Sequence, residues 1–148
     1  MTGFRFRLQR VLEWRRTQLE IAEAHFRQQA DAVAGLDRER AELEAAGISA
    51  EMQVRAWSPL GAGDLAALGN FRLLVRNRER EIAVRRAEAE KELAARQEAM
   101  LEARRRYRLL ERLRERRLAD WQAAADKELE DFAAEAYLAH WPRREAAG

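Results

Sequence analysis

Hydrophobic residues recur every three or four positions along the first third of the chain. Most of them belong to two series whose members are spaced seven residues apart. One series is Leu12, Leu19, Phe26, Val33 and Arg40, and the other is Leu8, Arg15, Ala22, Gln29, Leu36 and Leu43. Five consecutive heptads with a charged outer face predict a coiled-coil helix, which we place at about residues 4–57. Gly47 weakens this helix without ending it, because an interior glycine costs about 1 kcal/mol relative to alanine.

A second, longer apolar stripe follows residue 64. It runs through Leu68, Val75, Ile82, Ala89, Leu93, Met100, Ala103, Tyr107 and Leu110, and continues to Phe132. This stripe predicts a helix at about residues 65–140. At a rise of about 1.5 Å per residue, the two helices would be about 80 and 115 Å long.

Pro59 and Pro142 are the only prolines in the sequence, and each lies at the end of a predicted helix. A proline inside a helix removes a backbone donor and costs about 3 kcal/mol. Segment 58–64 combines Pro59 with two glycines, and Asp64 can cap the helix that follows. A connection this short makes neighbouring helices antiparallel. We therefore predict a single all-α domain over residues 1–148, a long antiparallel two-helix coiled-coil hairpin with a C-terminal helix overhang.

The register of the hairpin follows from the turn. If the turn centres near residue 60, facing residues have numbers that sum to about 120, so Phe26 lies near Leu93 and Leu8 near Leu110. From about Leu113 onward, the second helix has no first helix opposite it. An apolar face without an internal partner indicates a binding surface, with fraying or self-association as the alternative. The candidate residues of this overhang are Leu118, Trp121, Leu129 and Phe132.

Composition narrows the class of protein. Charged residues make up 36% and aromatic residues 7% of the chain, which fits long helices. There is no cysteine, so neither a disulfide framework nor a thiolate metal site is expected. No run of about 18 apolar residues occurs, and residues 1–14 carry arginines instead of the apolar block of a signal peptide. We expect a soluble, cytosolic protein without a membrane span.

Two arginine-rich segments of the sequence would lie side by side in the predicted hairpin register. Residues 5–16 hold five arginines against one glutamate, residues 104–117 hold eight against two, and residues 120–135 then carry six acidic residues against Lys127. Arginine pairs carboxylates bidentately, which favours an acidic protein partner; an ordinary solvated surface is the alternative. Nucleic acid fits less well, because the basic stretch abuts an acidic tail and lacks stacking aromatics apart from Tyr107. The candidate residues of this basic end are Arg5, Arg7, Arg10, Arg104, Arg105, Arg108 and Arg112.

A third cluster, Phe71, Leu74 and Val75, opens the second helix near the turn. Phe71 and Leu74 cannot both face the first helix if Val75 is central to the contact. The cluster is either ordinary packing under the turn or a patch for a partner.

Residues that carry chemistry are sparse. His25 and His140 are far apart, and no His/Glu spacing is typical of a metal site. The string Gly61-Ala62-Gly63-Asp64-Leu65-Ala66 matches a dinucleotide-binding pattern, but no strand precedes it, so we interpret it as a turn. We predict no enzymatic activity, no cofactor and no metal.

The opening Phe4-Arg5-Phe6-Arg7-Leu8-Gln9-Arg10-Val11-Leu12-Glu13-Trp14-Arg15-Arg16 resembles the start of the FliJ family of flagellar export proteins. The resemblance covers the chain: its length is similar, a glycine-containing turn near residue 60 precedes Asp64-Leu65 and Phe71, and an arginine-rich stretch ends in Leu110-Glu111-Arg112-Leu113. In the C-terminal signature of the family, Lys127 and Ala133 match, whereas two positions differ and the acidic pair is reversed.

The resemblance implies an antiparallel coiled coil similar to the stalk of rotary ATPase γ subunits. It also implies a soluble part of the flagellar type III export apparatus, peripheral at the cytoplasmic side of the cell membrane. Such a protein binds and regulates the hexameric export ATPase, couples it to the export gate and escorts export chaperones. The basic end would then contact the ATPase, and Phe71, Leu74 and Val75 the export gate. An injectisome stalk protein shares this shape and is the alternative, as is a nucleic-acid-binding coiled coil.

Overall fold

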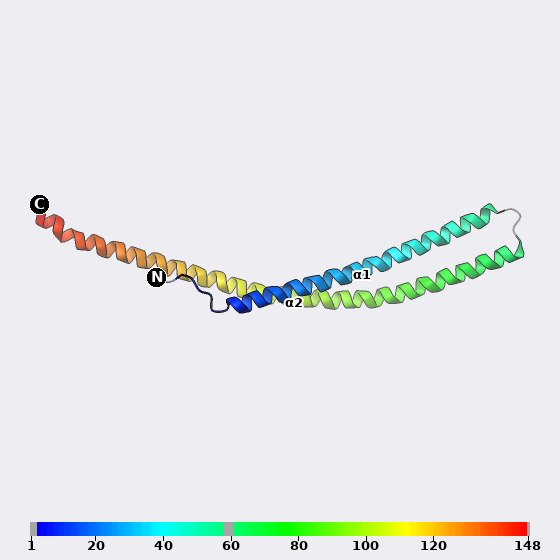
Figure 1. The fold of residues 1–148 in the computed structure, drawn as a ribbon, viewed down its shortest axis with the longest axis horizontal. Coiled ribbons are helices and arrows are strands. Elements are labelled where there is room, and N and C mark those ends of the chain that lie inside the picture. The colour runs from blue at the N-terminus through cyan, green and yellow to red at the C-terminus, as the bar shows by residue number, and fades with distance from the viewer. Residues whose placement is uncertain (1–2, 58–60, 148) are drawn as a thin grey trace. The chain divides into compact units, whose positions relative to one another are not determined.

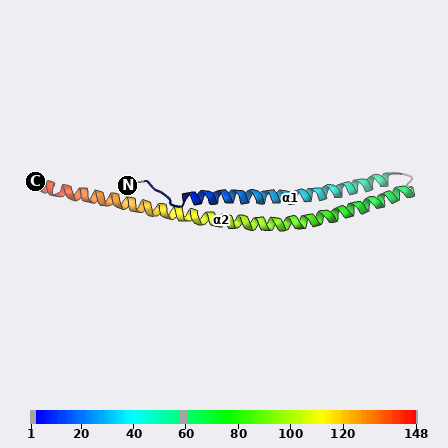
Figure 2. The ribbon, with the colours of Figure 1, turned by 60° about the horizontal axis from the view of Figure 1, so that its bottom comes forward.

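The protein consists of two long helices packed against each other in a computed structural model that describes residues 3–57 and 61–147. Helix α1 spans Gln9–Ala56 and helix α2 spans Ala62–Ala147 (Figure 1). Figures 1 and 2 both show residues 20–56 of α1 lying beside residues 62–102 of α2. No described residue lies in a strand, which confirms the predicted all-α class.

Helix α1 begins later than predicted. The apolar pattern placed its start at about residue 4, whereas residues 3–6 are non-helical and the helix begins at Gln9. The backbone N–H of Gln9 donates to the carbonyl oxygen of Phe6 at 3.1 Å, which closes a turn ahead of the helix. The Phe4 ring packs instead against Trp121, with the ring centroids 6.1 Å apart. Phe4 therefore contacts α2 and does not extend α1.

The start of α2 uses Asp64 in a different way from the one expected. Asp64 lies in the first turn of the helix, where its Oδ2 accepts a hydrogen bond from the backbone N–H of Gly61 at 3.1 Å. A carboxylate that reaches back in this way satisfies a backbone donor and suits the positive end of the helix dipole. The predicted turn residues Ser58, Pro59 and Leu60 lie outside the described residues.

Helix α2 continues past Pro142, which was expected to end it near His140. The helix extends to Ala147. The fixed φ of proline is compatible with a helix, although a proline inside a helix loses one backbone hydrogen bond and crowds the carbonyl group four residues before it. The predicted end of the helix was therefore too early.

The heptad positions form the seam between the helices. Among the described residues, the buried apolar side chains are Leu12, Val33, Leu36 and Ile82, and all four belong to the predicted stripes. Ile82 is only 1% exposed, whereas the seam position Arg40 is exposed and pairs with Glu44 at 3.3 Å. Two helices without a third layer enclose few side chains completely, so most other seam residues remain half-buried.

The chain divides into two compact units, and both helices contribute to each. We call Glu20–Glu102 the central unit, and Met1–Leu19 together with Ala103–Gly148 the terminal unit.

Hydrogen bonds between side chains and backbone join the helices of the central unit. The side-chain amide of Gln29 donates to the carbonyl oxygen of Ala89 at 2.9 Å, and Arg96 donates to that of His25 at 3.0 Å. The residue numbers of these two pairs sum to 118 and 121.

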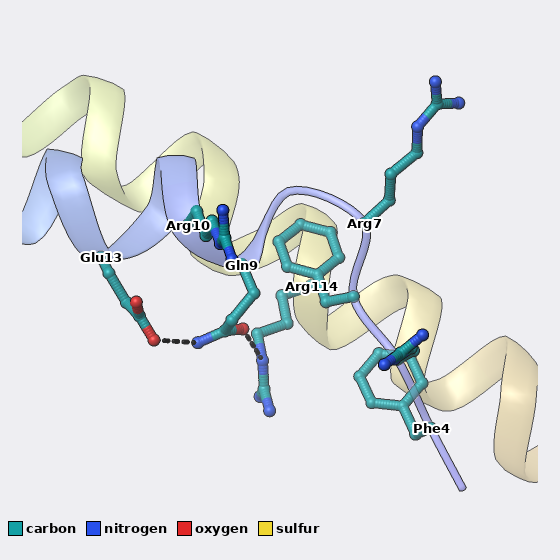
Figure 3. Close-up of a pocket in the computed structure, with 8 residues that line it drawn as sticks. Phe4, Arg7, Gln9, Arg10, Glu13 and Arg114 are labelled. Atoms are coloured by element: carbon teal, nitrogen blue, oxygen red, sulfur yellow. Dashed lines mark hydrogen bonds between the residues drawn. The ribbon is translucent and has the colours of Figure 1, made fainter.

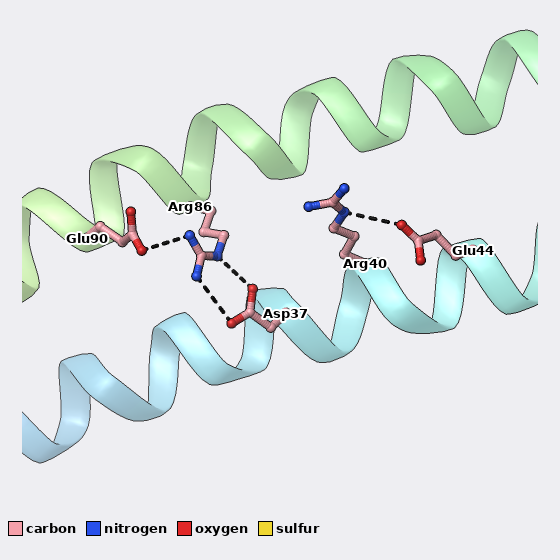
Figure 4. A network of polar contacts seen from close by, with 5 residues as sticks. All are labelled: Asp37, Arg40, Glu44, Arg86 and Glu90. Carbon is pink, nitrogen blue, oxygen red and sulfur yellow. Dashed lines mark hydrogen bonds and ion pairs between the residues drawn. The ribbon is translucent and has the colours of Figure 1, made fainter.

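Ion pairs flank the seam of the central unit (Figure 4). Arg86 Nε contacts Asp37 Oδ1 at 2.6 Å, and Arg86 Nη1 contacts Glu90 at 2.7 Å. The hydrogen bond from Arg86 lowers the pKa of Asp37 despite some desolvation, and the same contact raises the pKa of Arg86. Further interhelical pairs join Arg72 to Glu51, and both Arg78 and Arg85 to Glu39. These four arginines are therefore neutralised by acidic partners.

Candidate partner-binding surfaces

The non-helical N-terminal segment forms a cleft on α2 within the terminal unit (Figure 3). The cleft encloses about 830 Å³, and a neighbouring cavity of about 800 Å³ shares Phe4–Arg7 and extends to Leu113 and Trp121. The residues that line the cleft are Phe4, Arg5, Phe6, Arg7, Gln9, Arg10, Glu13 and Arg114.

A chain of contacts through Arg114 holds one wall of this cleft. Arg114 Nε donates to the side-chain oxygen of Gln9 at 3.2 Å, and the Gln9 amide donates to Glu13 Oε1 at 3.3 Å. The Arg114 guanidinium also lies 5.7 Å from the centroid of the Phe4 ring, within the range of a cation–π contact. Because Phe4 packs on Trp121 as well, α2 holds the N-terminal segment at two successive heptad positions.

The cleft is positively charged. Four arginines line it against the single carboxylate of Glu13. Among the described residues, no ion pair involves the three arginines at this end of the chain, whereas Arg72, Arg78 and Arg86 of the central unit are paired. Figure 3 shows Arg7 directed away from both helices. We call Arg5, Arg7 and Arg10 the N-terminal arginines; they present guanidinium groups suited to bidentate binding of carboxylates.

The structure brings together only part of the predicted basic end. The N-terminal arginines line the cleft, whereas Arg104, Arg105, Arg108 and Arg112 line neither cavity. Gln9 and Arg114 were missed as site residues. Their signal was present in the sequence, because Arg114 lies seven residues from both Tyr107 and Trp121 and so occupies the same seam.

The predicted overhang surface is partly covered. Trp121 packs against Phe4 and Leu118 is half-buried, so the first part of this surface already has an internal partner. Leu129 and Phe132 are 67% and 71% exposed. The exposed apolar face of α2 therefore begins beyond Trp121, later than the expected start at about Leu113.

The third cluster surrounds a cavity of about 480 Å³ in the central unit. Phe71 and Val75 line it together with residues of α1, whereas Leu74 points outward and is 65% exposed. This arrangement agrees with the prediction that Phe71 and Leu74 cannot both face α1. A Cβ atom on Gly47 would lie 3.8 Å from Val75 Cγ1, so the helices are close but not overpacked here.

Within residues 3–57 and 61–147, no group of three or more His, Asp or Glu side chains could hold a metal ion. No helix in the same ranges is long and apolar enough to cross a membrane. Comparison with known proteins found no matching family model, no similar curated protein and no similar solved structure.

Proposed function

We propose that this protein is a stalk-like component of a flagellar type III protein export apparatus that binds and regulates the hexameric export ATPase. In this proposal it is a soluble, non-catalytic coiled coil that acts at the cytoplasmic face of the membrane and couples the ATPase to the export gate. The proposal rests on the resemblance of the opening residues to the FliJ family and on the charge of the cleft that these residues build.

The order of the interhelical contacts supports the hairpin that this function needs. Gln29 contacts Ala89, whereas Arg72, which precedes Ala89, contacts Glu51, which follows Gln29. Partners on α2 thus move backward as positions on α1 advance. This order supports an antiparallel hairpin, and the exposed end of α2 beyond Trp121 supports an overhang.

The observation that carries the proposal is the cleft of unpaired arginines. The family-like opening segment supplies Phe4, Phe6 and the N-terminal arginines, which are five of the eight residues that line the cleft. A stalk inside a ring must contact subunits without forming a rigid apolar interface, and charge-assisted pairs are suited to such contacts. We infer that acidic side chains of the ATPase bind here.

The exposed side of the third cluster is the candidate contact with the export gate. Leu74 and Leu73 lie exposed beside the half-buried Phe71 and Val75. An exposed apolar pair next to a cavity gives a partner both an anchor and a pocket. Export chaperones are a further proposed partner, for which no surface is assigned.

The test is reconstitution with the export ATPase and the gate cytoplasmic domain of the same organism. The purified protein should stimulate ATP hydrolysis and be retained by the immobilised ATPase. Neither stimulation nor retention by either partner would refute the proposal. Stimulation of an injectisome ATPase, with no effect on the flagellar enzyme, would assign the protein to the injectisome system instead.

A further inference from the structure

One face of α2 in the terminal unit is positively charged in its first half and negatively charged in its second half. Six exposed residues follow one another at spacings of four, three, four, three and four, which keeps them on a single face of the helix. In chain order they are Arg112, Arg116, Ala119, Ala123, Asp126 and Glu130. We call this set the α2 stripe; it lies in the yellow to orange part of the helix in Figure 1.

The charged residues of the α2 stripe have no ion-pair partner within the described part of the chain. Among the described residues, none of Arg112, Arg116, Asp126 and Glu130 takes part in an ion pair. They cannot pair with one another inside the chain, because Arg112 and Glu130 are about 27 Å apart along the helix at about 1.5 Å per residue. The nearer pair, Arg116 and Asp126, is about 15 Å apart by the same rise.

The stripe is self-complementary. Arg112 and Glu130, Arg116 and Asp126, and Ala119 and Ala123 each lie symmetrically about position 121. A second stripe laid against the first in the antiparallel direction would place each arginine opposite a carboxylate. A parallel arrangement would place like charges together, which is unfavourable.

We propose that the α2 stripe binds the α2 stripe of a second copy of this chain in an antiparallel, two-fold symmetric dimer. The two-fold axis passes beside position 121, and four arginine–carboxylate pairs form, two on each side of the axis. Ala119 and Ala123 face each other at the centre, where their small side chains allow the helices to approach to about 8–10 Å.

The stripe is distinct from the cleft, so this dimer does not depend on the proposed function. Trp121 itself packs on Phe4 and does not belong to the stripe. Arg112 belongs to both the stripe and the predicted basic end, so dimerisation would block an acidic partner from that part of the basic end. Exposed ion pairs are screened by salt, so the dimer should be weak and should dissociate as ionic strength rises.

Analytical ultracentrifugation of the full chain tests the proposal. At about 0.05 M salt, where the Debye length exceeds 10 Å, the parent should shift from monomer to dimer as its concentration rises. Arg112→Glu with Arg116→Glu should raise the dimer dissociation constant at least tenfold. Asp126→Arg with Glu130→Arg should do the same, and an equimolar mixture of the two variants should associate again. The matched control is Glu128→Arg with Asp131→Arg, which makes the same charge change on another side of α2 and should leave the dissociation constant within a few-fold of the parent value.

Cross-linking tests the register. Because the chain has no cysteine, a chain carrying Ala119→Cys mixed with a chain carrying Ala123→Cys should form a mixed disulfide in preference to either homodimer. A parent that stays monomeric at low salt and high micromolar concentration would overturn the proposal. Association that survives both charge reversals, or that the mixture of reversed variants fails to restore, would also overturn it. Circular dichroism checks that each variant keeps its helical content.

Discussion

The most informative stability experiment is truncation of Ile82, the most completely buried side chain among the described residues. Ile82 is 1% exposed, and it lies on the seam of the central unit. Fully burying an isoleucine contributes about 1.5–3 kcal/mol, and truncation to alanine in a core costs about 2–5 kcal/mol once the cavity is included. Alanine regains a few tenths of a kcal/mol through helix propensity. Two helices can also collapse partly into the space, so we expect Ile82→Ala to lower the free energy of unfolding by about 2–3 kcal/mol.

Val84→Ala is the matched control, because Val84 lies on the same helix and is 60% exposed. It should change the free energy of unfolding by less than about 0.5 kcal/mol, and the gain in helix propensity makes a slight increase possible. Urea titrations followed by circular dichroism would measure both variants. If the two changes were equal, Ile82 would not be part of a packed seam, and the description of the central unit would be wrong.

Three further predictions concern the central unit and the basic end. Gly47→Ala should raise the free energy of unfolding by about 0.5–1 kcal/mol in urea titrations, because the added Cβ meets Val75 at an ordinary 3.8 Å; a decrease would show that the contact is tighter. The lowered pKa of Asp37 means that its stabilising contribution is present at neutral pH and is lost as the pH falls below about 4. The melting temperature of Asp37→Asn should therefore fall less steeply than that of the parent as the pH is lowered. Equal pH dependence of the two melting temperatures would contradict this. Reversing the charges of the basic-end arginines that lie on α2 should leave the melting temperature nearly unchanged while lowering ATPase stimulation. Full stimulation by this variant would show that these arginines do not belong to the binding surface. That variant changes Arg104, Arg105, Arg108 and Arg112 to glutamate.

The long-range organisation of the fold was predictable because a heptad repeat is a periodic signal. The pattern placed Leu12, Val33, Leu36 and Ile82 on the apolar stripes, and these are the buried apolar side chains among the described residues. The helix ends were not predictable to the same degree. Periodicity does not show that Phe4 leaves the helix to pack on Trp121, nor that the helix tolerates Pro142, because both depend on local contacts and backbone geometry.

The positive charge of the candidate site was predictable from the sequence, but the particular residues that line the cleft were not. The sequence indicated that arginines gather where residues 5–16 meet residues 104–117, and the N-terminal arginines do line the cleft. It could not separate Arg114, which faces the N-terminal segment, from the outward Arg108 and Arg112 without the helical phase of α2. The side of a helix on which a residue lies decides whether its charge lines the cleft or lies outside it.

The most direct test of the proposed function is the rate of ATP hydrolysis by the export ATPase in the presence of two matched variants. One variant reverses the N-terminal arginines to glutamate; the other reverses three exposed arginines of the central unit, Arg27, Arg55 and Arg80, and so has the same net charge. The proposal predicts that the parent and the central-unit variant stimulate hydrolysis alike, whereas the N-terminal variant loses most of the stimulation, because attraction to acidic side chains becomes repulsion. Equal stimulation by both variants would contradict the assignment of the cleft to the ATPase, and no stimulation by the parent would contradict the proposed function itself.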